Sequence, residues 1–290
     1  MSVVPVLEIG GTHVSAALVD PSDWSVPARV RLALEADADA DAVIGRFAAA
    51  AAGIDAPPAA RWGVAMPDPF DYQRGMGLFE GVGKFAALRG VDVGTALRRR
   101  MRSAPATLAF LNDADAFALG ECVAGAARGA RRCLGITLGT GIGSGWIVDG
   151  EIVDPGFPPD GRLHRLTIAG HPLEDVVSRR AIRRAFGAAG GDPGADVRGI
   201  AAAARAGDAR ARRVLDAAFV ELGRVVGSCQ SGFRPDVLVI GGSMAASWDV
   251  IGPAFRAGAE GSGLPEVRIA TDSDTAPLIG AARHAVRGVC

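Results

Sequence analysis

The sequence predicts an α/β protein made of two similar halves, each a sheet of strands with helices around it. The first observation is a glycine turn between two apolar runs near the start, VLEIGGTHVSAALVD. The second is that this pattern returns at Cys133–Asp149 as an apolar run, glycines with a threonine, an apolar run and an Asp. Helical and strand patterns alternate after each turn, and such internal repetition indicates one structural unit used twice.

The first half begins with three predicted strands, at Val3–Ile9, Val14–Asp20 and Ala28–Leu34. Short turns join them, which predicts an antiparallel meander. The run Ala36–Ala42 is predicted to be a loop whose last acid caps an Ala-rich helix that ends near Ala52. The elements expected next are a strand at Arg61–Met66, a glycine-rich binding loop at Phe70–Leu88, a helix at Val91–Met101, a strand at Ala106–Leu111 and a helix from Asn112 to about Ala126.

In the second half, strands at Cys133–Leu138 and Trp146–Asp149 flank the glycine turn Gly139–Gly145. We place the boundary between the halves near residues 111–130, with a first lobe at 1–112, joined by the C-terminal helix 275–290, and a second lobe at 113–274. Helices are predicted at Pro172–Phe186, Val197–Ala204, Asp208–Cys229 and Ala276–Val286, with strands at Asp236–Ile240 and Val267–Ala270. The helix Asp208–Cys229 carries an apolar stripe of Leu215, Phe219, Leu222 and Val226.

Composition limits the classes of function. The 290 residues are enough for one large or two medium domains, and the 31 basic and 32 acidic residues give no basic excess that would indicate nucleic-acid binding. The N-terminus has neither a cationic leader nor an apolar stretch of membrane-spanning length, so we expect a cytoplasmic protein. The four cysteines lie far apart without a CxxC pair, which favours buried free thiols over a zinc knuckle or a disulfide framework.

The glycine turns carry the first chemical hypothesis. A dinucleotide-binding turn needs GxGxxG at the start of a helix, but Gly139–Gly145 misses that spacing and leads into a strand, and no P-loop string occurs. The remaining interpretations are a tight hairpin and a hairpin turn whose backbone N–H groups approach phosphate oxygens, since glycine has no Cβ in the way. Two such turns, with hydroxyls from Thr12 and Thr140, favour polyphosphate binding.

Four motifs in this order resemble those of the ROK family of bacterial sugar kinases, within the actin/hexokinase/Hsp70 superfamily. Gly10-Gly11-Thr12, followed by His13, is similar to the first phosphate motif, and Leu138–Gly145, with Gly139, Thr140 and Gly141, to the second. The segment Leu111–Glu121, LNDADAFALGE, resembles the catalytic segment, and Val237–Met244, with Gly241 and Gly242, the adenosine motif. The resemblance covers nearly the whole chain and implies a two-lobed, actin-like ATPase (ribonuclease H-like) fold.

The resemblance also implies roles for particular side chains. Asp113 would be the general base that takes the proton of the attacking sugar hydroxyl, and Asn112 would bind the sugar. Asp113 lies at a predicted helix start, where the helix dipole favours its ionised form; an ordinary N-cap is the alternative role. Glu8 would orient Mg²⁺ through water, although the family has Asp at this position.

A further segment, Pro158–Ser178, departs from the family pattern. Many members have a histidine motif followed by a zinc-binding cysteine cluster there, but this segment contains no cysteine, so no zinc is expected. His164 matches the motif histidine, with His171 as its rival, and Glu174 matches the later sugar-binding glutamate. His164 is expected to share a strand face with Leu166 and Ile168, because side chains alternate along a strand. Asp160 is the only nearby candidate for the motif's acid.

Two residues of the first half are candidates for the sugar site by the same resemblance. Asp68, between Pro67 and Pro69, is a ligand of the sugar or narrows the pocket. Lys84, the only lysine in the chain, either contacts the sugar or is a solvated side chain.

The expected function is therefore transfer of the γ-phosphate of Mg-ATP to a hydroxyl of a hexose or amino-hexose, as in a glucokinase. A homodimer is expected, with a small sugar as substrate and neither nucleic acid nor membrane as partner. One alternative is a catalytically weak sugar-responsive binding protein. Another is a kinase that uses polyphosphate as donor, which would favour a basic groove.

Overall fold

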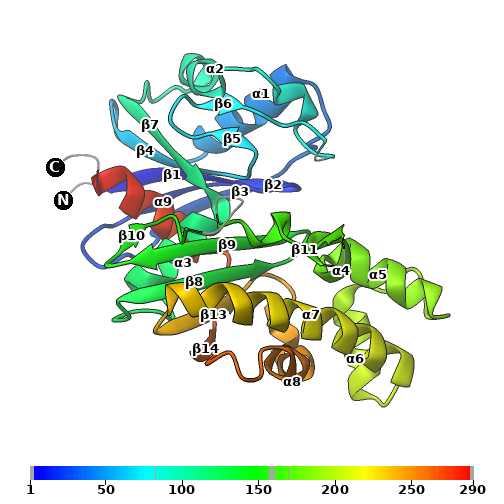
Figure 1. The fold of residues 1–290 in the computed structure, drawn as a ribbon. Coiled ribbons are helices and arrows are strands. Elements are labelled where there is room, and N and C mark those ends of the chain that lie inside the picture. Colours follow the sequence, from blue (N-terminus) through cyan, green and yellow to red (C-terminus); the bar gives the residue numbers. More distant parts are fainter. Residues whose placement is uncertain (1–2, 82, 157–160, 169, 288–290) are drawn as a thin grey trace. The chain divides into compact units, whose positions relative to one another are not determined.

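The fold was analysed in a computed structural model, which describes residues 3–81, 83–156, 161–168 and 170–287. The chain divides into two compact units, residues 1–124 with 274–290, and residues 125–273. Each unit contains a five-stranded mixed sheet with helices packed around it (Figure 1). The predicted α/β class with two similar halves is confirmed.

The sheet of the first unit has the order β3-β2-β1-β4-β7. β1 pairs antiparallel with β2 and parallel with β4, so the predicted meander continues into a parallel half. Its bounds are Val4–Ile9 (β1), His13–Val19 (β2), Ala28–Ala33 (β3), Arg61–Met66 (β4) and Thr107–Asn112 (β7). A short hairpin of β5 (Phe70–Asp71) and β6 (Met76–Gly77) and a 3₁₀ turn, η1 (Ala86–Leu88), lie within the predicted binding loop.

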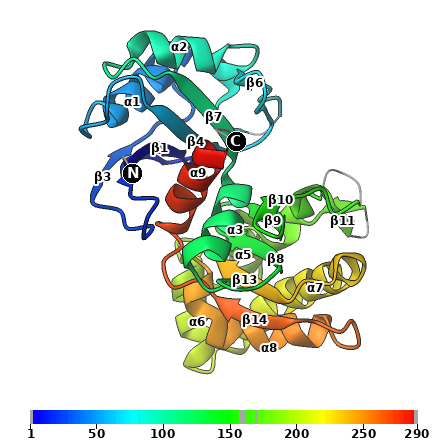
Figure 2. The ribbon, with the colours of Figure 1, turned by 90° about the vertical axis from the view of Figure 1, so that its left-hand side faces the viewer.

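Helices cover both faces of this sheet. α1 (Ala40–Ala51) and α2 (Val93–Arg100) pack on one face, and α9 (Ala276–Arg287) packs on the other face across β1 and β4 (Figure 2). α3 (Asp113–Ala124) packs closely on α9, because a Cβ at Gly120 would overlap the backbone of Ala276, and one at Gly280 that of Ala116. This packing keeps α3 in the first unit, whereas the sequence places the boundary after residue 112.

The second sheet repeats the topology of the first, with the order β10-β9-β8-β13-β14. β8 pairs antiparallel with β9 and parallel with β13, as β1 does with β2 and β4. The glycine turns therefore occupy equivalent places in the two sheets. The bounds are Arg132–Leu138 (β8), Ile142–Val148 (β9), Glu151–Ile152 (β10), Val237–Gly241 (β13) and Glu266–Ile269 (β14), with a separate hairpin of β11 (Thr167–Ile168) and β12 (His171–Pro172).

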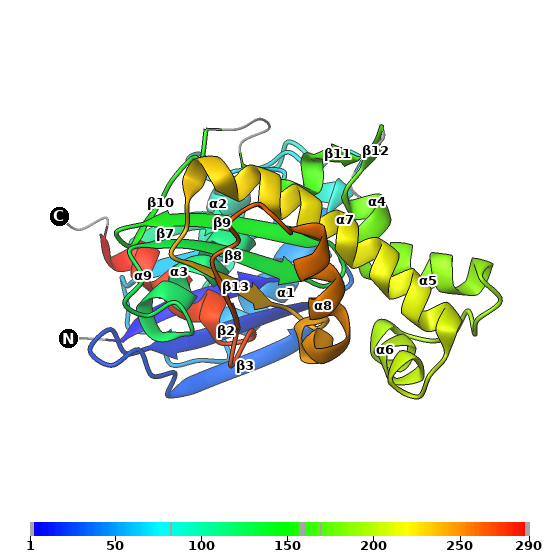
Figure 3. The same ribbon diagram turned by 60° about the horizontal axis from the view of Figure 1, so that its bottom comes forward.

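The long helix α7 (Ala209–Phe233) runs across one face of this sheet (Figures 1 and 3). Its predicted apolar stripe is confirmed, since Leu215, Phe219, Leu222 and Val226 are all fully buried in one cluster with the sheet. The remaining helices of the second unit are α4 (Glu174–Val177), α5 (Arg179–Ala188), α6 (Val197–Arg205) and α8 (Trp248–Gly258), with 3₁₀ turns η2 (Leu163–Arg165) and η3 (Ala245–Ser247). In the described part of the chain, none of the helices combines the length and apolarity that a membrane span requires.

Three local predictions are wrong. The cap of α1 is Asp39, whose carboxylate accepts from Ala42 N–H, rather than Asp41, the last acid of the run. The predicted helix Pro172–Phe186 is broken into α4 and α5, because Ser178 adopts an extended backbone and its side chain caps α5. His164 lies in η2 and not in a strand, so it does not share a strand face with its neighbours.

Candidate functional site

The first glycine turn, between β1 and β2, leaves backbone donors available. Gly10 N–H donates to the carbonyl of His13 at 2.9 Å, which closes the turn. The N–H groups of Gly11 and Thr12 have no hydrogen-bond partner within the described part of the chain. Such adjacent unpaired N–H groups form a concavity that favours an anion. Gly10 is required by space, because a Cβ there would lie 2.9 Å from Cε1 of His13.

Glu8 is tied to this turn through His13. Its Oε2 lies 3.2 Å from Nε2 of His13, and both side chains are largely buried, with 12 % and 23 % of their surface exposed. The other ring nitrogen of His13 lies 3.4 Å from the hydroxyl of Thr12. The longer side chain of Glu, compared with the Asp of the resembling family, therefore reaches a partner on the opposite strand.

Asp113 is the first residue of α3, immediately after β7. Asn112, not Asp113, makes the capping bonds, because its Oδ1 accepts from the N–H groups of Ala114 at 3.0 Å and Asp115 at 3.2 Å. Asp113 uses Oδ1 to accept from Ala114 N–H at 2.9 Å, and Oδ2 has no partner in the described residues. One carboxylate oxygen of Asp113 can therefore receive a proton.

The surroundings of Asp113 determine its protonation. Burial is the largest influence and raises the pKa of this carboxyl. Lys84 and the Ala114 N–H group lower the pKa, whereas the neighbouring charges of Asp68 and Glu8 raise it. The helix dipole was expected to favour the ionised form, but the desolvation of the charge outweighs it. A raised pKa brings the carboxylate closer to the strength that a general base needs near neutral pH.

A tyrosine that the sequence analysis did not select lies next to Asn112. The amide nitrogen of Asn112 donates to Tyr72 Oη at 3.1 Å, and this hydroxyl donates to the carbonyl of Met66 at 3.2 Å. Met66 ends β4, directly before Pro67 and Asp68. The bonds join the ends of β4 and β7 and hold Asn112 in a buried position, with 3 % of its surface exposed. No motif pointed to Tyr72, the only tyrosine of the chain.

The second glycine turn, in the second unit, has the same design. Gly139 N–H donates to the carbonyl of Gly141 at 3.0 Å, and the N–H groups of Thr140 and Gly141 have no partner among residues that the structure describes. The carboxylate of Glu174 lies against this turn, since a Cβ at Gly141 would overlap its Oε1. Glu174, selected as a sugar ligand, is therefore next to the second phosphate motif.

Arg179 connects three segments around this turn. Its backbone N–H donates to the carbonyl of Gly139 at 3.1 Å, and its guanidinium donates to the hydroxyl of Ser243 at 2.7 Å. Ser243 follows Gly241 and Gly242 at the end of β13. Gly242 has φ +82°, and a Cβ there would overlap the carbonyl of Leu138. The predicted adenosine motif thus lies against the second glycine turn.

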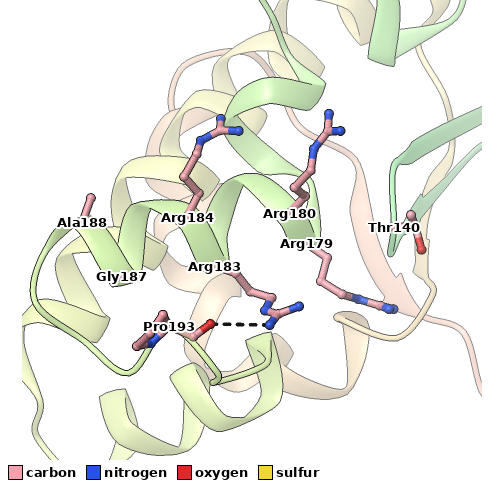
Figure 4. Close-up of a pocket in the computed structure, with 8 residues that line it drawn as sticks. All are labelled: Thr140, Arg179, Arg180, Arg183, Arg184, Gly187, Ala188 and Pro193. Atoms are coloured by element: carbon pink, nitrogen blue, oxygen red, sulfur yellow. Dashed lines mark hydrogen bonds between the residues drawn. The ribbon is translucent and has the colours of Figure 1, made fainter. Parts of the chain in front are cut away.

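An open pocket of about 450 Å³ extends from Thr140 along α5 (Figure 4). Its main feature is four arginines in one short helix. Arg183 also donates to the carbonyls of Pro193 and Ala195, and Arg184 to that of Asp175. The lining residues are Thr140, Arg179, Arg180, Arg183, Arg184, Gly187, Ala188 and Pro193. The sequence analysis did not single out these arginines, because nothing in the RRAIRR run distinguishes a pocket from a solvated helix face.

The segment that carries His164 is fixed to β9 by hydrogen bonds. The carbonyl of Gly161 accepts from Trp146 Nε1 at 2.8 Å and from the Ser144 hydroxyl at 2.9 Å. The Ser144 hydroxyl accepts in turn from Leu163 N–H at 3.1 Å. His164 is half-buried beside this anchor, whereas its rival His171 is exposed in β12. Asp160 lies outside the described residues.

The described residues contain no group of three or more His, Cys, Asp or Glu side chains that could hold a metal ion. The structure thus brings Glu8, His13, Asp68, Lys84, Asn112 and Asp113 together in the first unit, and Glu174 with Gly139–Gly141 and Gly242 in the second.

Comparisons with known proteins agree with these observations. The ROK family model matches residues 5–156 and 169–287. A glucokinase of Thermotoga maritima is 29 % identical over 271 residues, which covers 84 % of this chain and 83 % of that protein. The crystal structure of a ROK hexokinase from Thermus thermophilus has a TM-score of 0.79 at 26 % identity and covers 99 % of each chain. That of an inorganic polyphosphate/ATP-glucomannokinase from Arthrobacter sp. strain KM has a TM-score of 0.74 at 25 % identity, with 99 % and 100 % coverage.

Proposed function

Because this chain belongs to the ROK family and is a phosphotransferase that acts on an alcohol group, we propose that it transfers the γ-phosphate of Mg-ATP to a hydroxyl of a hexose or amino-hexose. Glucose is the first candidate, since the relative from Thermotoga maritima is named a glucokinase. The observation that carries the proposal is Asp113, a carboxylate with a raised pKa and one oxygen without a partner in the described residues.

Asp113 acts as the general base. As the sugar oxygen forms its bond to the γ-phosphorus, the hydroxyl proton moves to Oδ2 of Asp113. The bond between the γ-phosphorus and the bridging oxygen breaks, and its electron pair leaves with ADP. Oδ1 stays bonded to Ala114 N–H, so the carboxylate keeps its orientation during the proton transfer.

The glycine turns bind the phosphates of the donor. The N–H groups of Gly11 and Thr12 in one unit, and those of Thr140 and Gly141 in the other, are oriented donors that stabilise negative oxygens. The hydroxyls of Thr12 and Thr140 add donors, and Gly241 and Gly242 receive the adenosine end. Each turn joins two hydrogen-bonded strands of its own sheet, and this pairing keeps the N–H donors fixed.

The magnesium ion enters with the nucleotide as part of the substrate. Proteins usually hold Mg²⁺ with one or two carboxylates, water and substrate phosphates. Glu8 is the carboxylate of the first turn that would orient the hydrated ion. When bound, the ion neutralises charge on the phosphates.

The candidate sugar ligands are polar side chains that each unit carries. Asn112 precedes Asp113 in the chain, and the charge of Asp68 acts on the carboxyl of Asp113; we assign both residues to the sugar hydroxyls. His164 and Glu174 complete the set. A site that hydrogen-bonds several hydroxyls discriminates strongly, because a sugar that lacks one of them leaves a polar group unpaired.

The test is a coupled assay of ADP release across a panel of hexoses, amino-hexoses and N-acetylhexosamines. We expect ADP only when Mg-ATP and a suitable sugar are both present. Release without any sugar, or no release with every sugar of the panel, would contradict a sugar kinase. Silence combined with saturable sugar binding would instead identify the sugar-responsive binding protein.

The arginine pocket favours polyphosphate as a second candidate donor. Arg179 and Arg180 occupy the first turn of α5, where the helix dipole disfavours cations. That turn itself holds no acid, although Asp175 of α4 lies 3.8 Å from Arg180. Arg179 and Arg183, and likewise Arg180 and Arg184, are like charges at the i,i+4 spacing, which destabilises a helix. A bound polyanion would reverse both effects. The glucomannokinase found among the similar structures is named for both donors.

Replacing ATP by a defined inorganic polyphosphate in the assay, with sugar phosphate as the readout, tests this second donor. We expect Arg183→Gln/Arg184→Gln to lose activity with polyphosphate more than with ATP. Sugar phosphate with ATP but not with polyphosphate would leave ATP as the donor.

The cellular setting follows from the substrates. We propose that the protein acts in the cytoplasm, where Mg-ATP is available.

We also propose that the protein forms a homodimer. Light scattering would measure twice the chain mass of 29.6 kDa for the dimer.

A further inference from the structure

Lys84 is exceptional in the composition of this chain. Of 31 lysine and arginine residues, it is the only lysine. Arginine and lysine are equivalent for a solvated positive charge, and this chain uses arginine at every other position. The single lysine therefore indicates a position at which an ammonium group can do what a guanidinium group cannot. Lysine presents a compact point charge, whereas arginine presents a planar fork suited to bidentate partners.

The side chain of Lys84 runs along the first glycine turn. Its Cδ lies 3.7 Å from the position that a Cβ at Gly11 would take, so the lysine stem lies within van der Waals distance of the turn. The N–H groups of Gly11 and Thr12 point to no other partner in the described residues. An ammonium group beside two unpaired N–H groups makes one anion-binding site.

The charge of Lys84 has no fixed partner. Within the part of the chain that the structure describes, Lys84 makes no hydrogen bond and no ion pair, although it is half-buried. The charges of Asp68 and Glu8 raise the pKa of Asp113, and Lys84 is the largest influence that lowers it. Its positive charge thus acts on the carboxyl of Asp113, although no hydrogen bond or ion pair joins the two side chains.

The backbone around Lys84 is held in an unusual conformation. Phe85 has φ +56°, a value that bulky side chains rarely adopt, and Gly83 has φ +66°. Phe85 is fully buried against Phe79 and Phe47, and its N–H donates to the carbonyl of Ala36 at 2.7 Å. Such strain persists where surrounding packing imposes it, and it concentrates at functional sites. The aromatic cluster fixes the base of the Lys84 side chain.

We propose that Lys84 is a catalytic residue whose ammonium group binds the phosphoryl group during transfer and, at the same time, faces Asp113. The proposal rests on the proposed kinase function and replaces the sugar contact expected for this residue. Lys84 stays protonated throughout the step. The sugar oxygen bonds to the phosphorus, the bond to the leaving phosphate oxygen breaks, and the hydroxyl proton goes to Asp113. A positive charge on the phosphoryl oxygens stabilises the charge that develops there.

Three variants test the proposal kinetically. Lys84→Met should lower kcat by about 10²–10³, the cost of one donor to a developing oxyanion. It should also move the acid limb of the kcat/KM profile to higher pH, because Asp113 keeps the raising influences of burial, Asp68 and Glu8 and loses the larger of the two lowering ones. Lys84→Arg keeps the positive charge, so its acid limb should lie at the wild-type pH, whereas its kcat should stay close to that of Lys84→Met. Arg89→Met, an exposed neighbour paired with Glu80, is the matched control and should leave both unchanged.

The outcomes separate this proposal from the kinase function. An active wild-type protein with an equally active Lys84→Met variant of unchanged thermal stability would overturn the role of Lys84 alone. A higher sugar KM with unchanged kcat and acid limb would return Lys84 to the sugar site. A wild-type protein that is inactive with every sugar would overturn the kinase function itself.

A measurement without turnover exploits the single lysine. Reductive ¹³C-methylation labels only the Lys84 amine and the N-terminal amine, so the NMR spectrum contains two groups of signals. Inorganic tripolyphosphate should shift the Lys84 signal and leave the N-terminal one in place, and glucose alone should shift neither. A Lys84 signal that does not respond to tripolyphosphate would overturn the phosphate contact, whether or not the protein is active.

Discussion

Asp113 combines two properties that oppose each other in a folded protein. Its carboxylate is available to accept a proton, and its half-buried position makes the charged form costly. Asn112 takes over the capping of α3, which a helix-start Asp would otherwise provide. This arrangement leaves the carboxylate of Asp113 available for the role of base that we propose for it.

The variant Asp113→Asn should lower turnover by about 10² or more, with sugar affinity changed only a few-fold. Amide and carboxylate have nearly the same shape, but the amide cannot accept the hydroxyl proton. Steady-state kinetics together with equilibrium sugar binding measures both quantities. Turnover close to that of the wild type would remove Asp113 from the role of base.

The same variant should be more stable than the wild type at neutral pH. Folding raises the pKa of Asp113 above its ordinary value of 3.8, so the folded state favours the protonated carboxyl. Below pH 3.8 the carboxyl is protonated in both states and does not change the stability. As the pH rises through the folded-state pKa, the buried charge lowers the free energy of unfolding. Asn carries no charge at any pH. The Tm of Asp113→Asn should therefore exceed that of the wild type at pH 8 and approach it near pH 4. A difference that grows as the pH falls would contradict the raised pKa.

Gly141 tests the second turn. A Cβ there would overlap Glu174 Oε1, and the φ of Gly141 is not in the left-handed region, so an alanine at this position requires the Glu174 side chain to move. We expect Gly141→Ala to raise the KM for the donor at least tenfold, by displacing Glu174 and the turn; tenfold is about 1.4 kcal/mol. Gly232→Ala in α7 is the control, since a Cβ at Gly232 meets nothing within 4 Å. A donor KM equal in the two variants would show that the turn does not bind the donor.

At the scale of single elements, the segment around His164 depends on its anchor to β9. In Trp146→Phe the aromatic packing remains, but the 2.8 Å bond to the carbonyl of Gly161 is lost. We expect a sugar KM raised several-fold with little change in the KM for ATP, because only the sugar segment is loosened.

Trp248→Phe, in a tryptophan of α8 that packs on Phe255, provides the matched control for Trp146→Phe. If the two variants lowered activity alike, or if Trp146→Phe acted on ATP alone, the anchor would have no specific part in sugar binding.

Elements with long patterns could be predicted from the sequence, and those set by single contacts could not. The stripe of α7 and the strand at Arg61–Met66 agree with the structure because burial along the whole element fixes their periodicity. The break at Ser178 and the cap at Asp39 depend on one side-chain bond each. His164 was assigned to a strand from an alternation of three residues, too short to exclude η2.

The site shows the same limit. Motifs led to Asp113, Glu8 and the glycine turns, because their residue types are unusual in those places. They did not lead to Tyr72, Trp146 or Arg179, which act through contacts with residues distant in the sequence. The sequence also could not show that burial is the largest influence on the pKa of Asp113, because burial is known only from the folded structure.

At the scale of the whole molecule, two units with the same sheet topology each present a glycine turn between their first two strands. The hydrogen bonds of Ser144 and Trp146 fix the segment that many members of the resembling family organise with zinc cysteines.

We therefore expect the purified protein to contain no stoichiometric zinc, and chelators to inhibit it only by removing magnesium. Elemental analysis that finds one zinc per chain would contradict this expectation, as would inhibition by a zinc-selective chelator in excess magnesium.

The central claim is that the chain moves a phosphoryl group from Mg-ATP to a sugar hydroxyl with Asp113 as base. The most direct measurement is ³¹P NMR of a reaction with glucose and Mg-ATP, run with the wild-type protein and with Asp113→Asn. The wild type should produce a sugar-phosphate signal in proportion to ADP, and the variant should produce almost none in the same time. Inorganic phosphate in place of sugar phosphate, or equal sugar-phosphate signals from both proteins, would contradict the account.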